Sequence, residues 1–169
     1  MAEVVFQDFS IKVKKAMEDA LIAGLHEAAG ELEERTIDNS RQGYRYGDKL
    51  ATDLWTHKVD ESKMEASVGS PYEAGFWEEF GTGEHAVDKS KSRNGWWVYI
   101  EGGSGYEGKT NTYYSQEEAE SMAAYIRKEY NLPAYATNGI EPNEPLQKAF
   151  KSGKKAVKAI MESKLKGMG

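Results

Sequence analysis

Hydrophobic residues recur every three or four positions in two long segments, one toward each end of the chain. This 3.6-residue period predicts two amphipathic helices. The first runs from about Ser10, its expected N-cap, to Arg35, and its apolar stripe is Val13, Met17, Leu21, Leu25, Ala28 and Leu32. The second begins at Pro145, which fits the first turn of a helix. Its apolar stripe is Leu146, Phe150, Val157, Ile160, Met161 and Leu165.

Shorter regions between these helices alternate hydrophobic and polar residues with the period of two that half-buried strands show. Leu50–Ser70 predicts a β-hairpin with its turn at Asp60–Lys63. Trp96–Ile100 is rich in aromatic and β-branched residues and predicts another strand. Residues 135–137 are expected to be a short extended segment, and Thr110–Tyr114 predicts one more short strand.

Ser115–Glu118 matches a capping box, in which the serine side chain accepts from a backbone N–H and Glu118 reaches back. A helix is therefore expected to start here and to run to about Tyr130. Together the elements predict an α+β fold: a small antiparallel sheet flanked by long N- and C-terminal amphipathic helices, with an inserted helix. No Pro- or Ser-rich linker divides the chain. Residues 1–169 are thus expected to form a single domain, with an insert at about 84–138.

The stretch Pro71–Gly83, with the sequence PYEAGFWEEFGTG, predicts a short aromatic helix that ends in a glycine turn. Tyr72, Phe76 and Phe80 are spaced by four residues and share one helical face, which Trp77 widens. The residues expected to point toward solvent are Glu73, Glu78 and Glu79. We expect the aromatic face to be the centre of the core, so Phe80→Ala should destabilise the fold by about 3–5 kcal/mol.

This stretch resembles a known protein family. Pro-Tyr, a short spacer and then Glu-Phe-Gly-Thr-Gly are similar to the centre of the neck or tail-completion proteins of long-tailed double-stranded DNA bacteriophages. In that family a second motif follows downstream, a Gly, a Pro, then Pro-Phe-Leu and an alanine that opens the last helix. Residues 139–150, GIEPNEPLQKAF, match it in spacing. One departure is that Leu146 directly follows Pro145 where the family has Phe, and Phe150 is expected to compensate in packing.

The resemblance covers nearly the whole chain when the flanking helices are included. The residues that carry it are Pro71, Tyr72, Phe76, Trp77, Glu79, Phe80, Gly81, Thr82, Gly83, Gly139, Pro142, Pro145, Leu146, Ala149 and Phe150. It implies a structural virion protein at the head–tail junction, which forms a ring that completes the tail or neck and leaves a channel for DNA. A tail terminator or a head-closure (stopper) ring component is the alternative within the same machine.

The partners that the resemblance implies are further copies of the chain, in a sixfold or twelvefold ring, together with head-closure or connector proteins and tail terminator or tail tube proteins. A ring closes through head-to-tail interfaces, so each subunit needs two different contact surfaces. The candidates lie in two polar loops, in the terminal helices and in a short apolar arm before the first helix: Phe6, Phe9, Arg41, Tyr44, Arg45, Tyr46, His85, Lys89, Lys91, Arg93, Lys154 and Lys158. The arm, with Phe6 and Phe9, is expected either to close the domain's own core or to extend onto a neighbouring subunit. The lysine-rich side of the last helix is either a solvated surface that suits the helix dipole or a docking face for an acidic partner.

The composition of the chain excludes or disfavours several further classes of protein. The formal net charge of -6 disfavours a general nucleic-acid binder, and it is compatible with a channel through which DNA passes without sticking. The chain has no cysteine, which excludes disulfides and thiolate metal sites. No apolar run approaches the ~20 residues of a membrane span, and the first residues lack the pattern of a secretory signal. We expect a protein made in the host cytoplasm and built into the virion, with no membrane contact.

No catalytic constellation stands out. The cluster of Glu84, His85 and Asp88 lies in a polar loop and matches no usual zinc or di-metal spacing. We therefore expect no enzyme activity, no cofactor and no metal. Two alternatives of another class stay open. One is a small hydrolase that uses His85, and the other is a single-stranded nucleic-acid binder that uses Arg41, Tyr44, Arg45 and Tyr46.

Overall fold

The computed structural model describes residues 10–42, 52–88, 95–100 and 115–167. Contacts divide the chain into two compact units: unit 1 comprises residues 1–72 and 145–169, and unit 2 comprises residues 73–144. The α+β class is confirmed, since each unit combines helices with a two-stranded antiparallel sheet. Among the described residues, two such sheets replace the single small sheet that was expected. Unit 2 is also larger than the expected insert of residues 84–138, because it includes the parts of the two motifs next to the insert, residues 73–83 and 139–144.

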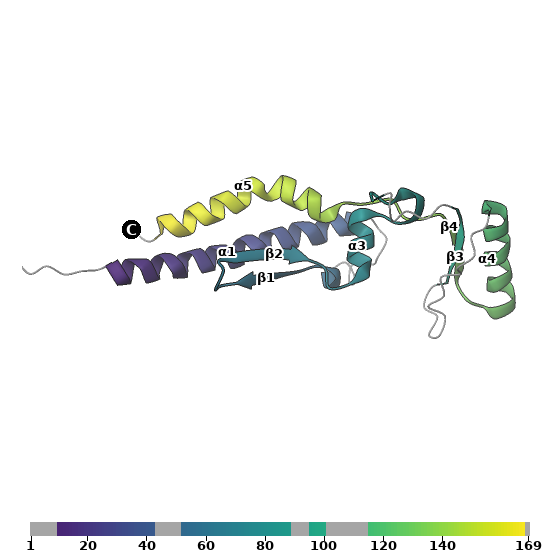
Figure 1. The fold of residues 1–169 in the computed structure, drawn as a ribbon, viewed down its shortest axis with the longest axis horizontal. Helices are drawn as coiled ribbons and strands as arrows, with labels where there is room; N and C mark the ends of the chain where they lie inside the picture. The colour runs from purple at the N-terminus through teal and green to yellow at the C-terminus, as the bar shows by residue number, and fades with distance from the viewer. Residues whose placement is uncertain (1–9, 43–51, 89–94, 101–114, 168–169) are drawn as a thin grey trace, which may run out of the picture. The chain divides into compact units, whose positions relative to one another are not determined.

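Unit 1 is built on two long helices, α1 (Ser10–Gln42) and α5 (Pro145–Lys166), which lie side by side and antiparallel (Figure 1). A glycine allows them to approach closely, because a Cβ at Gly153 would lie 2.7 Å from Leu32 Cδ2. The start of α5 at Pro145 confirms the predicted boundary. The buried residues of α5 are Pro145, Ala149 and Gly153, none of which belongs to the predicted apolar stripe. Phe150 and Leu165 of that stripe are 50% and 41% exposed, so their predicted place on the buried side is wrong.

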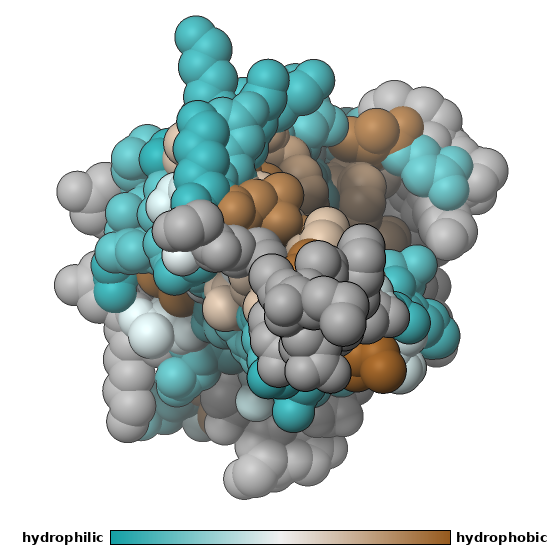
Figure 2. Space-filling view, turned by 90° about the vertical axis from the view of Figure 1, so that its left-hand side faces the viewer, coloured by the Kyte–Doolittle hydropathy of each residue, from teal (hydrophilic) through white to brown (hydrophobic). Residues whose placement is uncertain are grey.

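α1 starts at Ser10 as predicted, but its end and the burial of its first turns differ from the prediction. The helix extends to Gln42, seven residues further than expected, and its buried residues begin only at Gly24. Val13 and Met17 are 54% and 45% exposed, so the prediction that they face the core is wrong. The reason is geometric: Gly24 already lies against Met161, near the end of α5, so the first turns of α1 extend past that helix. Figure 2 faces this end of unit 1 and shows hydrophobic side chains among polar ones.

A β-hairpin completes unit 1. β1 (Thr56–Asp60) pairs with β2 (Glu65–Gly69), and both strands contact α1. The hairpin and its turn are confirmed, but its first strand starts later than expected, because Leu54 belongs to a helical turn and is buried. Trp55 is also buried, and its indole N–H donates to Ser40 Oγ at 2.6 Å. Buried polar contacts therefore tie the end of α1 to the hairpin.

Unit 2 contains the second sheet and one helix that covers it. The elements of unit 2 are α3 (Glu73–Phe80), the 3-10 turn η1 (Gly83–His85), β3 (Trp97–Ile100), α4 (Gln116–Tyr130) and β4 (Ala134–Thr137). β3 and β4 pair antiparallel. Val98, Ala123 and Ala134 are almost wholly buried and form the core between this sheet and α4. The predicted strand at Trp96–Ile100 is thus confirmed to within one residue, and Thr110–Tyr114 lies outside the described residues.

The predicted capping box starts α4. Ser115 Oγ accepts from the Glu118 backbone N–H, and Glu118 Oε2 accepts from both the backbone N–H and the hydroxyl of Ser115, at 2.9 Å each. These bonds, the backbone one first, lower the pKa of Glu118 below its ordinary value. Asn131 ends the helix in the left-handed conformation. Both ends of α4 therefore follow from local sequence.

The orientation of α3 is the opposite of the predicted one. Glu78 and Glu79 are 1% and 6% exposed, whereas Tyr72, Phe76 and Phe80 are 57%, 50% and 43% exposed. Phe76 and Phe80 do contact each other, with ring centroids 4.8 Å apart. The prediction of an aromatic core with outward glutamates is therefore wrong. The physical reason is a hydrogen-bond partner for Glu78 that lies far away in the sequence, described below.

Within the described parts of the chain, no helix combines the length and the apolar character that crossing a bilayer requires.

Candidate functional site

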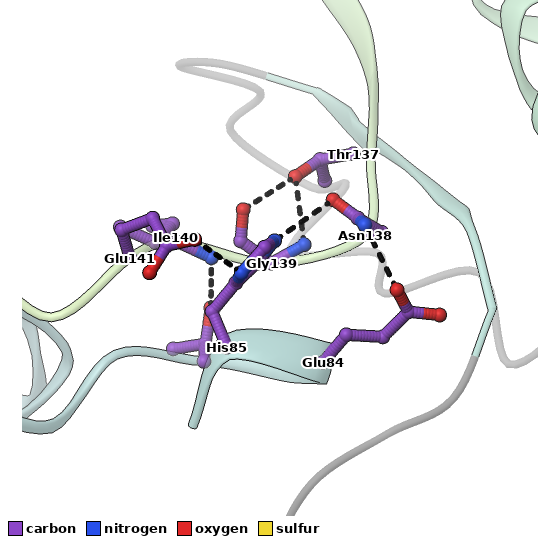
Figure 3. A network of polar contacts seen from close by, with 8 residues as sticks. Glu84, His85, Thr137, Asn138, Gly139, Ile140 and Glu141 are labelled. Carbon is purple, nitrogen blue, oxygen red and sulfur yellow. Dashed lines mark hydrogen bonds and ion pairs between the residues drawn. The ribbon is translucent and has the colours of Figure 1, made fainter. Parts of the chain in front are cut away.

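The two sequence motifs pair with each other in unit 2. The Thr82 N–H donates to the Ile140 carbonyl at 2.9 Å, and the Ile140 N–H donates back to the Thr82 carbonyl at 3.3 Å and to Thr82 Oγ1 at 3.1 Å. The Glu84 N–H donates to the Asn138 carbonyl at 2.9 Å. Because Thr82 and Ile140 are 58 positions apart, this pairing closes a long loop. We call the pairing of residues 78–85 with residues 138–143 the motif clamp (Figure 3).

Three glycines permit this close approach. Gly81, Gly83 and Gly139 all have positive φ, of 68°, 61° and 135°. A Cβ at Gly83 would lie 2.1 Å from the Asn138 carbonyl oxygen, and one at Gly139 would lie 2.1 Å from the Thr82 carbonyl oxygen. Any larger residue would therefore meet backbone atoms that cannot move aside, in a conformation that L-residues rarely adopt. The motif glycines are required by geometry at these positions.

A buried carboxylate continues the motif clamp beyond the glycines. Glu78 Oε1 accepts from Asn143 Nδ2 at 2.7 Å, and the Asn143 backbone N–H donates to the Glu78 carbonyl at 2.9 Å. Asn143 thus holds both the side chain and the backbone of Glu78. The other oxygen, Glu78 Oε2, is buried and has no hydrogen-bond partner among the described residues. This arrangement explains why α3 turns a glutamate inward, since only a donor from the second motif satisfies that side chain.

Side chains at the exposed edge of the motif clamp add a second layer of contacts, drawn in Figure 3. His85 Nδ1 lies 2.6 Å from Glu141 Oε1, and His85 Nε2 lies 3.4 Å from Asn138 Oδ1. Asn138 Nδ2 also donates to Glu84 Oε2 at 3.0 Å. Each of these side chains bridges the same two segments that the backbone bonds join. The contacts therefore reinforce the motif clamp.

One carboxyl of this layer has a shifted pKa. Glu84 accepts a hydrogen bond from the Gly95 backbone N–H at 3.1 Å in addition to that from Asn138. These bonds, the Gly95 bond first, stabilise the ionised form and lower the pKa of Glu84 below its ordinary value. At neutral pH the carboxylate is therefore charged and holds the end of β3 close to the motif clamp.

The chemistry of the motif clamp is that of a structural joint. Both ring nitrogens of His85 face Glu141 and Asn138, so the contacts given for the ring are with a carboxylate and an amide. Within the described residues, no group of three or more His, Asp or Glu side chains could hold a metal ion. The contacts of the motif clamp fix the positions of two backbone segments, residues 78–85 and 138–143, relative to each other. Such a joint sets the position of the residues that leave it on either side.

The structure brings together some of the predicted motif residues and separates others. Gly81, Thr82, Gly83, Gly139 and Pro142 meet in the motif clamp. Glu79 is buried nearby in α3. The remaining motif residues are distributed over α3, the bend before it and α5: Pro71, Tyr72, Phe76, Trp77, Phe80, Pro145, Leu146, Ala149 and Phe150.

One of these residues, Phe150, corrects the sequence analysis on α5. Pro145 and Ala149 are buried, in agreement with a core role. Phe150, which was expected to compensate for the missing family Phe, is 50% exposed, so that expectation is wrong. On a helix, Phe150 lies one residue past Ala149 and is therefore turned away from the buried side.

The interface candidates fall into four groups. Lys154 and Lys158 lie on the exposed side of α5. Arg41 is engaged within unit 1, because its guanidinium pairs with Asp38 and donates to Thr52 Oγ1, at 3.1 Å each. His85 belongs to the motif clamp. The other candidates lie outside the described residues: Phe6, Phe9, Tyr44, Arg45, Tyr46, Lys89, Lys91 and Arg93.

Sequence reasoning missed the residues on the far side of the motif clamp. Asn138 and Asn143 each use an amide group to bridge both segments, and Glu78 is the buried partner of Asn143. The available signal was their position, since both asparagines lie within four residues of the motif residues Gly139 and Pro142. Asparagine next to glycine or proline is common in turns, so this signal alone does not indicate a cross-chain contact.

No family model, curated protein or solved structure matches the chain. The relation to phage neck and tail-completion proteins therefore depends on the two motifs alone and stays a prediction.

Proposed function

We propose that this protein is a structural component of a bacteriophage virion, located at the head–tail junction. Copies of the chain form a sixfold or twelvefold ring that completes the tail or neck, contacts the head-closure and tail proteins, and leaves a channel for DNA. The observation that supports this proposal best is the motif clamp. The two motifs that carry the family resemblance are the same two segments that hydrogen-bond through their backbones.

Two motifs that matched the family by chance would not be expected to contact each other in the structure. Here they do, and the three positive-φ glycines where they cross allow the two backbones to approach closely. A joint whose hydrogen bonds hold two backbone segments together suits a protein that positions surfaces against neighbours. The net charge of -6 suits a wall along which DNA slides, because it offers no excess of cations to phosphates.

The test is electron microscopy of a phage lysate in which this gene carries an early stop codon. We expect DNA-filled heads separate from finished tails. Tails of uncontrolled length would favour the tail terminator role instead. Normal joined and infectious particles would contradict the proposal.

A plasmid copy of the gene supplies matched controls. The wild-type gene and Gly30→Ala, whose new methyl group would meet nothing within 4 Å, should restore joined particles. Gly83→Ala should fail to restore them, because it places a Cβ against the backbone of the motif clamp. If both variants restored joined particles equally well, the motif clamp would not be needed for the proposed function.

A further inference from the structure

Charge is distributed unevenly along the chain. Residues 73–144, which make up unit 2, contain thirteen Asp and Glu against six Lys and Arg, so this unit is strongly acidic. α5 in unit 1 contains seven lysines and a single glutamate. A basic helix and an acidic unit in the same chain provide two surfaces of opposite sign, which is what a head-to-tail contact between identical copies requires.

The lysines of α5 are concentrated on its solvent side. The buried positions are Pro145, Ala149 and Gly153, and the exposed lysines on the other side of the helix include Lys151, Lys154, Lys155 and Lys158. Their spacing of three and four residues brings neighbouring ammonium groups onto one surface. Lys158 pairs with Glu162 at 3.7 Å, but within the described residues no ion pair involves Lys151, Lys154 or Lys155. The ammonium groups on this basic face of α5 therefore repel one another, which favours binding of an acidic partner.

Unit 2 has a pocket of matching chemistry on α4. Glu117, Glu118, Ser121, Met122 and Tyr125 line an open pocket of about 510 Å³. A lysine side chain has an apolar stem and a charged tip. The stem fits Met122 and the ring of Tyr125, and the tip fits the two carboxylates, with a further cation–π contribution from the tyrosine.

We propose that the basic face of α5 in one copy docks on the acidic pocket of α4 in a second copy, with Lys154 and Lys158 as its central residues. The inference rests on the proposed ring, and it names the two surfaces from which the ring is built. Charge complementarity favours a second copy of the chain as the partner, because docking pairs the lysines of one copy with the carboxylates of the other. A nucleic acid would satisfy only the lysines and would be repelled by the acidic remainder of the chain.

The test uses a charge exchange between two variants of the full chain. The first variant is Lys154→Glu/Lys158→Glu, and the second is Glu117→Lys, which reverses the charge of a carboxylate of the pocket and leaves the capping-box residues Ser115 and Glu118 intact. Self-association is followed by sedimentation velocity at low salt, and circular dichroism verifies that each variant is folded. Each variant alone should associate at least about tenfold more weakly than the wild type, because like charges face each other.

Mixing the two variants is the decisive step. In an equimolar mixture the acidic α5 of the first variant meets the basic α4 of the second, and the unchanged basic α5 of the second meets the unchanged acidic α4 of the first. Association should therefore return, and it should weaken as salt is added. The control Lys58→Glu/Lys63→Glu makes the same change of charge on the β-hairpin and should associate like the wild type.

Three results would overturn the inference. One is a wild-type chain that stays monomeric at low salt, and another is wild-type association in both variants. The third is a salt-dependent DNA gel shift that Lys154→Glu/Lys158→Glu abolishes without changing self-association, which would assign the basic face of α5 to nucleic acid. If the variants associate normally while the stop-codon phage still yields unjoined heads and tails, the proposed function stands and only these surfaces are wrong.

Discussion

The two units of the chain are stabilised in different ways. Unit 1 buries small and aliphatic residues such as Ala28, Leu32 and Ala149 between two long helices. Unit 2 has a small core and is organised around the motif clamp, where backbone groups and glycines meet. Side-chain packing can adjust to a small change by shifting a flexible neighbour. A backbone crossing cannot adjust in this way. We therefore expect substitutions in the motif clamp to lower the free energy of unfolding more than comparable substitutions in the helix pair.

The largest expected effect is that of Gly83→Ala. Its Cβ would lie 2.1 Å from the Asn138 carbonyl oxygen and 2.6 Å from the Trp97 ring, at a φ of 61°. Backbone strain and overpacking together should lower the free energy of unfolding by about 3–5 kcal/mol. Denaturant unfolding followed by circular dichroism measures this change.

Gly30→Ala in α1 is the matched control for that measurement. Nothing lies within 4 Å of its new methyl group, so the gain in helix propensity should raise the free energy of unfolding by about 0.5–1 kcal/mol. A similar loss of unfolding free energy in Gly83→Ala and Gly30→Ala would contradict the expected difference between the two units.

The next effect is that of Asn143→Ala in the motif clamp. It removes the donor to the buried Glu78 carboxylate, whose other oxygen already lacks a partner. This loss, which leaves a second buried oxygen of Glu78 without its donor, should cost about 2–3 kcal/mol. The same change at Asn39 in unit 1, where the amide donates to the Pro145 carbonyl, should cost only about 1 kcal/mol. A double variant that adds Glu78→Gln should recover part of the loss, and no recovery would show that the charge of Glu78 is not the cause.

A smaller effect is expected for Phe80→Ala. The sequence analysis predicted a core residue, but Phe80 is 43% exposed. Because about half of the side chain stays in water, the expected loss falls to about 1–2 kcal/mol. Thermal melting measures it, with Val98→Ala as a comparison at a wholly buried site of the same unit. A loss near 4 kcal/mol would restore the original prediction of an aromatic core.

The smallest expected effect is a change in pH dependence. The pKa of Glu118 is lowered by bonds from Ser115, so the stabilisation is complete above the ordinary glutamate pKa and is lost as the pH falls through the lowered value. Ser115→Ala removes the hydroxyl bond and should raise that pKa toward its ordinary value. A carboxyl NMR titration detects the shift. In unit 1, Ser62→Ala should do the same for Asp60, whose pKa is lowered first by the Ser62 hydroxyl. An unchanged Glu118 titration would contradict the capping box.

Most of the elements could be predicted because they depend on local signals. The capping box of α4, the start of α5 at Pro145 and the turn at Asp60 each depend on residues within a few positions of one another. The exposure of Val13 could not be predicted, because it depends on where α5 ends relative to α1. The added length of α1 lies at its other end, where Asn39 donates to the Pro145 carbonyl 106 positions away.

The motif clamp shows the same limit at the level of a site. The two motifs indicated which residues matter, but no periodicity shows that Thr82 meets Ile140. The orientation of α3 followed from Asn143, 65 positions beyond Glu78. A hydrophobic pattern assigns a helix its apolar side, and here a distant hydrogen-bond donor outweighed that pattern by giving the buried glutamate a partner.

The antiparallel pairing of α1 with α5 has a consequence for how the chain is made. α1 is synthesised early and its partner helix about 100 residues later, and at roughly 5–20 residues per second this delay lasts about 5–20 s. The β-hairpin follows α1 sooner and can cover part of it while the ribosome continues. Until α5 leaves the exit tunnel, the rest of the apolar stripe of α1 is available to chaperones and to the nascent chains of neighbouring ribosomes.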